Sequence, residues 1–153
     1  MSEFLQPWLA AAAAMALALS APATSGEDGP MLTDPGSLQW RHRLVVVFAA
    51  DEASATAAQD TLAGAGDPVL ERDILWFVVR DETTRTNYAG TMAADFAVTL
   101  RQAYRGPPAG APTEVVLVGK DGGVKSRGPT LDPAALFGEI DRMPMRRQEM
   151  RER

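Results

Sequence analysis

Short motifs that pair basic with acidic side chains are the parts of this sequence best suited to chemistry. They contribute the candidate binding residues Arg41, Glu71, Arg72, Asp73, Lys120, Asp121, Arg146 and Arg147. Guanidinium and ammonium groups donate charge-assisted hydrogen bonds, so Arg72, Lys120 and Arg146 could hold a carboxylate or phosphate of a partner. The alternative is a structural ion network, in which carboxylates such as Asp141 and Glu149 neutralise the same cations and fasten the chain end to the domain.

Residue types used in covalent and metal catalysis are scarce. The chain has no cysteine and a single histidine, His42, which excludes a thiolate nucleophile, thiol–disulfide exchange and cysteine-ligated metal centres. His42 lies between Arg41 and Arg43, whose charges should lower its pKa. Ser54 and Thr56 have no evident base to activate them. We therefore expect a non-catalytic protein without a metal or other cofactor.

Composition narrows the choice of partners. The chain has 15 basic and 20 acidic residues among 153, a formal charge of -5, which argues against nucleic acid because phosphate neutralisation needs a basic surface. With 46% hydrophobic residues, one globular domain is expected. Five arginines fall in the last twelve residues. This pattern favours a basic C-terminal tail over residues 143–153 that is solvated and frayed.

The N-terminal segment is typical of a secretory signal peptide. An apolar run from Trp8 to Leu19 precedes small residues, and cleavage after Ala23 is predicted. The run is too short to span a bilayer, so no stable membrane anchor should remain after cleavage. Glu3 and the lack of basic residues before the run fit a signal peptide poorly, and an Ala-rich helix packed on the domain is the alternative. The prediction is a periplasmic or secreted protein with a flexible leader over residues 24–37.

The rest of the chain alternates between strand and helix patterns. The continuous apolar run at 44–49 predicts a central strand buried on both faces. A helix capped by Asp51 should follow and end near Gly64. The expected order is strand 44–49, helix 51–64, strand 74–79, helix 92–104, strand 115–118, turn 121–123, strand 124–127 and helix 132–140. These segments predict an α/β domain over residues 38–142 with a four-stranded mixed sheet and the order β-α-β-α-β-β-α.

This order resembles the thioredoxin core. Phe48-Ala49-Ala50-Asp51 resembles the end of its central strand, and Ala111-Pro112-Thr113 resembles its cis-proline segment. The resemblance implies that the active-site cysteines would fall near Ala53 and Thr56, where none is present. It also implies a second candidate binding site, a cis-proline pole, with the residues Asp51, Thr56, Pro112 and Thr113. Helix capping alone also explains Asp51.

A more specific resemblance is to family 4174 of the domains of unknown function, an uncharacterised group of exported bacterial proteins. The residues that carry it are Trp40-Arg41-His42-Arg43, Glu71-Arg72-Asp73, Gly119–Lys125 and Met143–Met150. The family is similar to domains of vertebrate sushi-repeat and matrix proteins. It implies a thioredoxin-like fold and an extracytoplasmic setting, and no established activity.

Placed on a thioredoxin-like topology, the charged motifs meet at one end of the sheet. The strand that ends at Lys120 runs antiparallel to the strand that begins after Arg41, and the parallel strand after Asp73 starts at that same end. We call this end the charged pole. The preferred function is a non-catalytic interaction module for an extracytoplasmic protein or peptide. The alternative is a cysteine-less enzyme or redox-accessory protein that binds a partner's peptide near Pro112.

Overall fold

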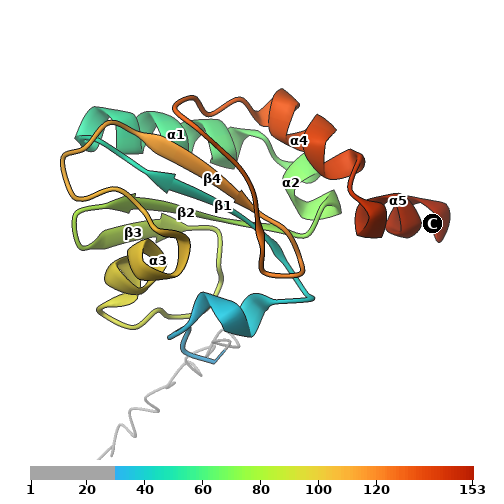
Figure 1. Cartoon of the computed structure of the whole chain (residues 1–153), viewed down its shortest axis with the longest axis horizontal. Helices are drawn as coiled ribbons and strands as arrows, with labels where there is room; N and C mark the ends of the chain where they lie inside the picture. Colours follow the sequence, from blue (N-terminus) through green and yellow to red (C-terminus); the bar gives the residue numbers. More distant parts are fainter. Residues whose placement is uncertain (1–29) are drawn as a thin grey trace, which may run out of the picture.

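The computed structural model describes residues 30–153, and the predicted signal peptide and most of the predicted leader lie outside this range. Eleven elements follow one another along the described part (Figure 1). They are η1 (Pro35–Leu38), β1 (Arg43–Phe48), α1 (Glu52–Gly64), α2 (Asp67–Glu71), β2 (Ile74–Arg80), β3 (Thr83–Thr86), α3 (Phe96–Tyr104), β4 (Glu114–Val118), β5 (Val124–Gly128), α4 (Pro133–Asp141) and α5 (Pro144–Arg151).

The sheet is mixed and open, with the strand order β3-β2-β1-β4-β5. All six residues of β1 are buried, which confirms the predicted central strand. β1 is parallel to β2, with Arg43 opposite Ile74, and antiparallel to β4, with Leu44 opposite Val118. The parallel pairing was expected from the strand–helix–strand order, and the antiparallel pairing from the resemblance to the thioredoxin core. The turn before β5 places Gly122 at a φ of 82°, a backbone conformation that favours glycine.

The predicted number of four strands is wrong, because β3 adds a fifth. Its sequence, Thr-Thr-Arg-Thr, has no apolar residue to signal a strand. Threonine is nevertheless favoured in strands by its β-branched side chain. A tight connection after β2 lets Thr83 pair with Arg80. As an edge strand β3 has one unpaired side, and polar residues suit that position because they discourage pairing with other chains.

Side chains of β1 alternate between two hydrophobic cores, one on each face of the sheet. Leu44, Val46 and Phe48 pack with η1 and α3 on one face. Val45 and Val47 pack on the opposite face with α1, α2 and α4. Figure 1 shows these helices on the two sides of the sheet. Two covered faces explain why β1 reads as an unbroken apolar run.

Both ends of the described chain are more ordered than the sequence pattern predicts. In the segment assigned to the flexible leader, Leu32 is buried and its N–H donates to the carbonyl of Thr91 at 2.8 Å. Asp34 then caps η1 by accepting from the N–H of Gly36. At the other end, the predicted frayed tail instead contains α5. The alternative, in which ion pairs fasten the chain end, describes this segment better.

Candidate functional site

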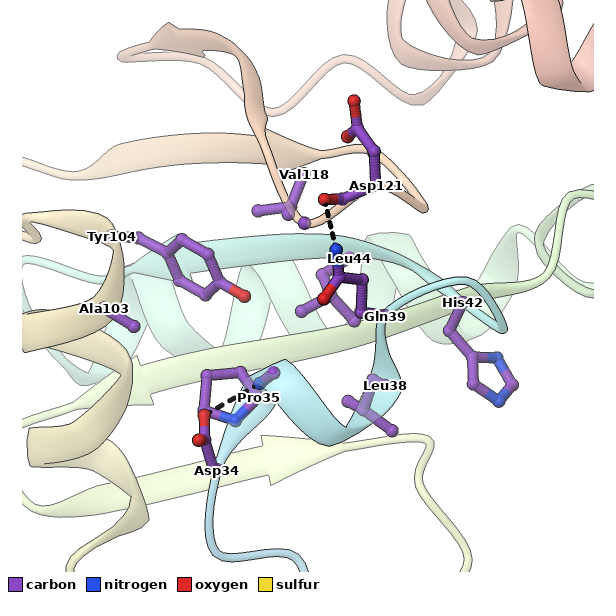
Figure 2. A pocket seen from close by; sticks show the side chains of 13 residues that line it. Asp34, Pro35, Leu38, Gln39, His42, Leu44, Ala103, Tyr104, Val118 and Asp121 are labelled. Atoms are coloured by element: carbon purple, nitrogen blue, oxygen red, sulfur yellow. Dashed lines mark hydrogen bonds between the residues drawn. The ribbon is translucent and has the colours of Figure 1, made fainter.

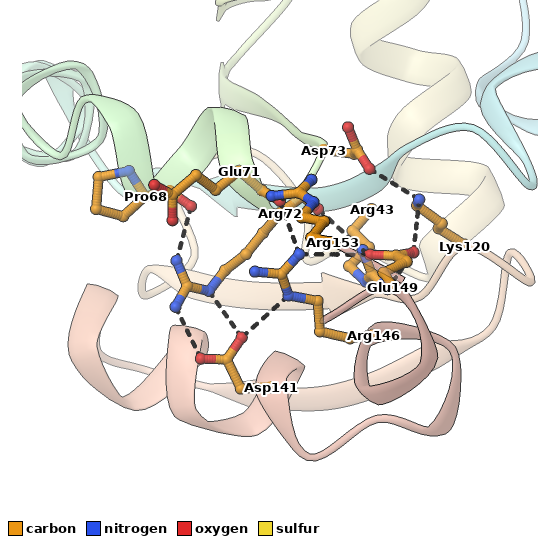
Figure 3. Close-up of polar contacts among 10 residues, drawn as sticks. All are labelled: Arg43, Pro68, Glu71, Arg72, Asp73, Lys120, Asp141, Arg146, Glu149 and Arg153. Carbon is orange, nitrogen blue, oxygen red and sulfur yellow. Dashed lines mark hydrogen bonds and ion pairs between the residues drawn. The ribbon is translucent and has the colours of Figure 1, made fainter. Parts of the chain in front are cut away.

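The charged pole holds an ion network of seven residues, drawn in Figure 3: Arg43, Arg72, Asp73, Lys120, Asp141, Arg146 and Glu149. Glu149 of α5 is at one centre of it. Its two carboxylate oxygens accept from Nη1 and Nη2 of Arg43 at 3.2 and 3.1 Å. Nζ of Lys120 donates to the same carboxylate at 2.8 Å and to Asp73 at 2.9 Å. The start of β1, the end of β4 and α5 are thus joined.

Asp141, at the end of α4, is the second centre. Arg72 donates to both of its oxygens, from Nε at 3.0 Å and from Nη2 at 2.7 Å. This two-point contact is the strongest geometry that a guanidinium and a carboxylate can form. Nε of Arg146 donates to Asp141 at 3.2 Å. The guanidinium of Arg72 also lies 4.7 Å from the ring centroid of Phe137, a cation–π contact.

The surrounding cations keep both carboxyl groups ionised. Burial by itself raises the pKa of Glu149, but hydrogen bonds from Arg43 and Lys120 and their positive charges outweigh it and lower that pKa to about 2. Hydrogen bonds from Arg72, together with the nearby charges of Arg72 and Arg146, lower the pKa of Asp141 against a smaller effect of burial. The network therefore persists at neutral pH and is sensitive to acid.

Half of the residues predicted for the charged pole belong to the network. These are Arg72, Asp73, Lys120 and Arg146. The other four lie outside it. The Arg41 side chain donates to the carbonyl of Ser37, and Glu71 contributes only its backbone carbonyl. Asp121 pairs with Lys125, and Arg147 is exposed. The prediction also missed Arg43, which is only 1% exposed. Its position at the start of the predicted buried strand could have indicated that its side chain is buried.

The arginines of the network already donate hydrogen bonds to backbone carbonyls of the protein itself. Nη1 of Arg72 donates to the carbonyl of Pro68, and Nη1 of Arg43 donates to the carbonyl of Arg72. Nη1 of Arg146 donates to the carbonyl of Glu71 at 2.8 Å. A partner's carboxylate or phosphate would have to displace these contacts. What the arrangement does chemically is attach α5 to the sheet.

A groove beside the network is open to solvent. Its volume is about 430 Å³, and it is lined by Trp40, Arg43, Gly119, Lys120, Asp121, Lys125, Met143, Pro144 and Met145. Trp40 is 60% exposed and has a φ of 69°, in the left-handed region that non-glycine residues rarely adopt. Its N–H donates to the carbonyl of Lys120 at 2.6 Å. We call this site the Trp40 groove. In the sequence, Trp40 is distinguished only as part of a family motif.

At the predicted cis-proline pole, Pro112 and Thr113 line one cavity, and Asp51 and Thr56 do not line it. The peptide bond before Pro112 is trans, like every peptide bond in residues 30–153. Pro112 and Thr113 line a cavity of about 400 Å³, and the Thr113 hydroxyl accepts from the N–H of Ala50 at 3.1 Å. Asp51 caps α1 by accepting from the N–H of Ser54. Thr56 contacts Glu52 on the exposed side of that helix.

His42 is half-buried and has no evident catalytic partner. Its pKa is lowered chiefly by burial, with smaller effects from the charges of Arg41 and Lys120. The predicted direction is confirmed, although burial outweighs the neighbouring arginine named as the cause. Between residues 30 and 153, no three His, Asp or Glu side chains are grouped closely enough to bind a metal ion. No helix in that range is long and apolar enough to cross a bilayer.

Fold and site together define an α/β domain with an open five-stranded mixed sheet, flanking helices and an internal ion network at one end. The chain belongs to the family described as Domain of unknown function (DUF4174), whose model matches residues 35–149. The matched segment begins with η1 and ends at Glu149, so it includes all seven network residues. The chain matches no curated protein and no solved structure.

Proposed function

We propose that this protein is an exported, non-catalytic binding module on a thioredoxin-like scaffold. Its ligand is a short apolar and acidic segment of an extracytoplasmic partner protein, held in the Trp40 groove. The observation that carries the proposal is the large aromatic side chain of Trp40, which stands 60% exposed beside methionine and lysine side chains. Tryptophan is enriched among the residues that dominate protein–protein binding energies.

The backbone around Trp40 supports a role for its side chain. A left-handed conformation costs about 1–2 kcal/mol in a residue with a Cβ atom, and glycine would avoid that cost. Trp40 is held there by its hydrogen bond to the carbonyl of Lys120 and by the turn that contains it, in which the N–H of Arg41 donates to the carbonyl of Leu38. Strain of this kind is concentrated at functional sites. Met143 and Met145 also line the groove and give it an adaptable apolar wall.

The charged residues that line the Trp40 groove determine which kind of partner segment can bind there. Arg43, Lys120 and Lys125 line the groove against one carboxylate, that of Asp121, whereas the whole chain has a formal charge of -5. Each of these cations already has a carboxylate partner in the protein, Glu149 for Arg43 and Lys120, and Asp121 for Lys125, so a partner's carboxylate would bind by sharing or displacing one of these contacts. Complementary charge guides association and discriminates among partners. An acidic residue beside an apolar anchor in the partner would match both the lysines and Trp40.

Sheet topology and sequence support the remaining parts of the proposal. Parallel β1 and β2 beside antiparallel β4 and β5, with helices on both faces, is the arrangement expected of a thioredoxin-like core. The absence of cysteine excludes that fold's usual thiol chemistry. The predicted signal peptide supports export to the periplasm or the medium.

The alternative function is peptide binding near Pro112 by a cysteine-less enzyme or redox-accessory protein. One observation favours it, the cavity of about 400 Å³ that Pro107, Pro112 and Thr113 help to line. A peptide-binding experiment can distinguish the two sites, because the groove and this cavity have no lining residue in common.

Selection from a displayed library of random twelve-residue peptides tests the proposal. We expect the enriched peptides to combine aromatic or aliphatic residues with Asp or Glu. Trp40→Ala should weaken their binding at least tenfold, as expected for an anchor residue. Leu70→Ala is the matched control, because Leu70 is 68% exposed and does not line the groove. Unfolding curves of both variants check that they remain folded.

Three outcomes would contradict the proposal. If the enriched peptides lack acidic residues, the ligand is not an acidic segment. If they bind Trp40→Ala as well as the unchanged protein, the Trp40 groove is not their binding site. Peptides lost in Thr113→Val but kept in Trp40→Ala would support the site at Pro112 instead. A selection that enriches no peptide would overturn peptide binding altogether.

A further inference from the structure

A separate cavity lies on the other side of the β4–β5 turn, between η1 and the end of α3 (Figure 2). Its volume is about 290 Å³, near the lower end of the range for small-molecule sites. Leu38, Leu44 and Val118 form an apolar part of its wall. Of the predicted site residues, only Asp121 lines it. We call it the Tyr104 cavity.

Tyr104 brings an unsatisfied polar group to this cavity. The residue is only 6% exposed, its hydroxyl points into the cavity in Figure 2, and the structure gives that hydroxyl no hydrogen-bond partner among residues 30–153. The hydroxyl itself is not fully buried, because part of its surface is open to the cavity, so its hydrogen-bonding capacity is available to a ligand there. Burial and the charge of Asp34 raise the pKa of Tyr104 to about 12. The hydroxyl is therefore protonated at neutral pH and can both donate and accept.

The charged groups around the cavity favour a cation. Asp34 and Asp121 are acidic, and no lysine or arginine lines this site. Asp121 turns its carboxylate toward Lys125 and away from the cavity. Asp34 uses Oδ1 to accept from Gly36 and is close enough for its charge to raise the pKa of Tyr104. Its carboxylate is thus the charge that a ligand beside Tyr104 would meet.

We infer that the Tyr104 cavity binds a small organic cation, a primary ammonium group on a short apolar stem. The ammonium group lies between the Asp34 carboxylate and the Tyr104 hydroxyl, where it donates hydrogen bonds to both. The stem packs on Leu38, Leu44 and Val118. This small-molecule site goes beyond the proposed binding of a protein segment, because it rests on a different cavity and a different ligand class.

Titration of the isotope-labelled full chain with three probes of one length tests the ligand class. The probes are hexylammonium, hexan-1-ol and hexanoate, each followed by the amide signals of Ala103, Gly119 and Gly122. We expect saturable shifts with hexylammonium, at least tenfold weaker binding of the alcohol and no binding of hexanoate, since a charged hydrogen bond is the stronger one. Equal binding of the alcohol, or stronger binding of hexanoate, would overturn the inference.

Two conservative variants test the two polar groups. Tyr104→Phe removes only the hydroxyl, and Asp34→Asn removes the charge while its side-chain oxygen can still accept from Gly36. Each should weaken hexylammonium binding about tenfold. Tyr88→Phe and Asp132→Asn are the matched controls, because Tyr88 donates to Pro30 and Asp132 caps α4, both outside this cavity. The controls should bind like the unchanged protein.

Two further results keep this test separate from that of the proposed function. Trp40→Ala should retain hexylammonium binding, because Trp40 does not line the cavity. Unchanged affinity in both Tyr104→Phe and Asp34→Asn, with folding confirmed from dispersed amide spectra, would refute the assignment of the two groups. Absence of any shift up to about 20 mM hexylammonium would refute the site itself.

Discussion

Arg43 is a charged residue buried at the start of the central strand. It is 1% exposed, and its Nε has no hydrogen-bond partner within residues 30–153. Removing a guanidinium from water is costly, and paired carboxylates and carbonyls offset that cost. Glu149 supplies the carboxylate, with a side chain that is 21% exposed. The pair is therefore much less screened by water than a surface ion pair.

Glu149→Gln should lower the free energy of unfolding by about 3 kcal/mol at pH 7. Because the pKa of Glu149 is about 2 in the folded protein against 4.5 ordinarily, its contribution is complete above about pH 5 and declines as the pH falls toward 2. The variant should lose this part of the pH dependence. Urea unfolding of both proteins between pH 3 and pH 7 measures it.

Glu52→Gln is the control for that experiment. Glu52 forms ion pairs with Arg80 and Arg85, but its side chain is 53% exposed, and exposed pairs contribute little to stability. We expect its unfolding curve to stay close to that of the unchanged protein. Equal destabilisation by the two substitutions would show that burial of the Arg43–Glu149 pair has no special effect.

At the residue scale, the sequence predicted which charged motifs meet and missed how they pair. The convergence of Arg72, Lys120 and Arg146 follows from strand direction, which the apolar runs reveal. The choice of Arg43 over Arg41 depends on which side chain the sheet buries, and the two residues differ by only two positions. Trp40 and Tyr104 were missed as site residues because exposure and an unpaired hydroxyl are visible only in three dimensions.

At the scale of elements, α5 differs from the other helices in how it is attached. Within Pro144–Arg151 only Arg146 is buried, and the apolar residues Met145 and Met150 are exposed. The helix therefore lacks the buried apolar face that holds most surface helices on a core. Ion pairs and hydrogen bonds to Arg43, Lys120 and Asp141 hold it instead.

This mode of attachment predicts that α5 separates from the sheet before the domain unfolds in acid. Protonation of Glu149 and Asp141 removes the charge-assisted bonds of the helix, whereas the apolar cores around β1 are unaffected. Backbone amide relaxation should therefore show increased mobility in residues 144–151 as the pH falls to about 2, near the pKa of Glu149, while β1 and β4 remain rigid. Simultaneous loss of order in α5 and the sheet would contradict the prediction.

Most helices and strands with an apolar signal were predicted, but α3 begins at Phe96 and not at residue 92, and α2 was not expected. The buried runs of β1, β2 and β4 and the capped starts of α1 and α4 all depend on local sequence. β3 has no apolar residue, and pairing with β2 defines it as a strand. α5 resembles a solvated basic tail, because the carboxylates and backbone carbonyls that hold Arg146 come from Asp141, Glu149 and Glu71.

At the scale of the whole molecule, the binding proposals concern one end of the domain. The Trp40 groove and the Tyr104 cavity lie on either side of the β4–β5 turn, and both are lined by Gly119 and Asp121. The pole where thioredoxins carry their cysteines is at the other end of β1 and has no cysteine here. On this proposal, the chain keeps a thioredoxin-like framework and uses the opposite end of the sheet.

Export makes a prediction about the whole chain. If the signal peptide is cleaved after Ala23, protein recovered from the extracytoplasmic fraction should begin at Thr24. Intact-mass measurement with N-terminal sequencing tests this directly, and Ala23→Leu should block cleavage because the peptidase requires a small residue there. A full-length chain confined to the cytoplasm would contradict both the cleavage and the proposed setting.

The Arg43–Glu149 pair also bears on when the domain can fold. Its two members are 106 positions apart in the sequence, so during synthesis Arg43 has no carboxylate to accompany it into the core until the chain has grown through Glu149. Contacts at such a distance form late, because the intervening loop must close first. The charged pole is therefore completed last, when almost the whole chain has been made, whereas the apolar cores around β1 contain no residue of α5 and do not depend on the pair.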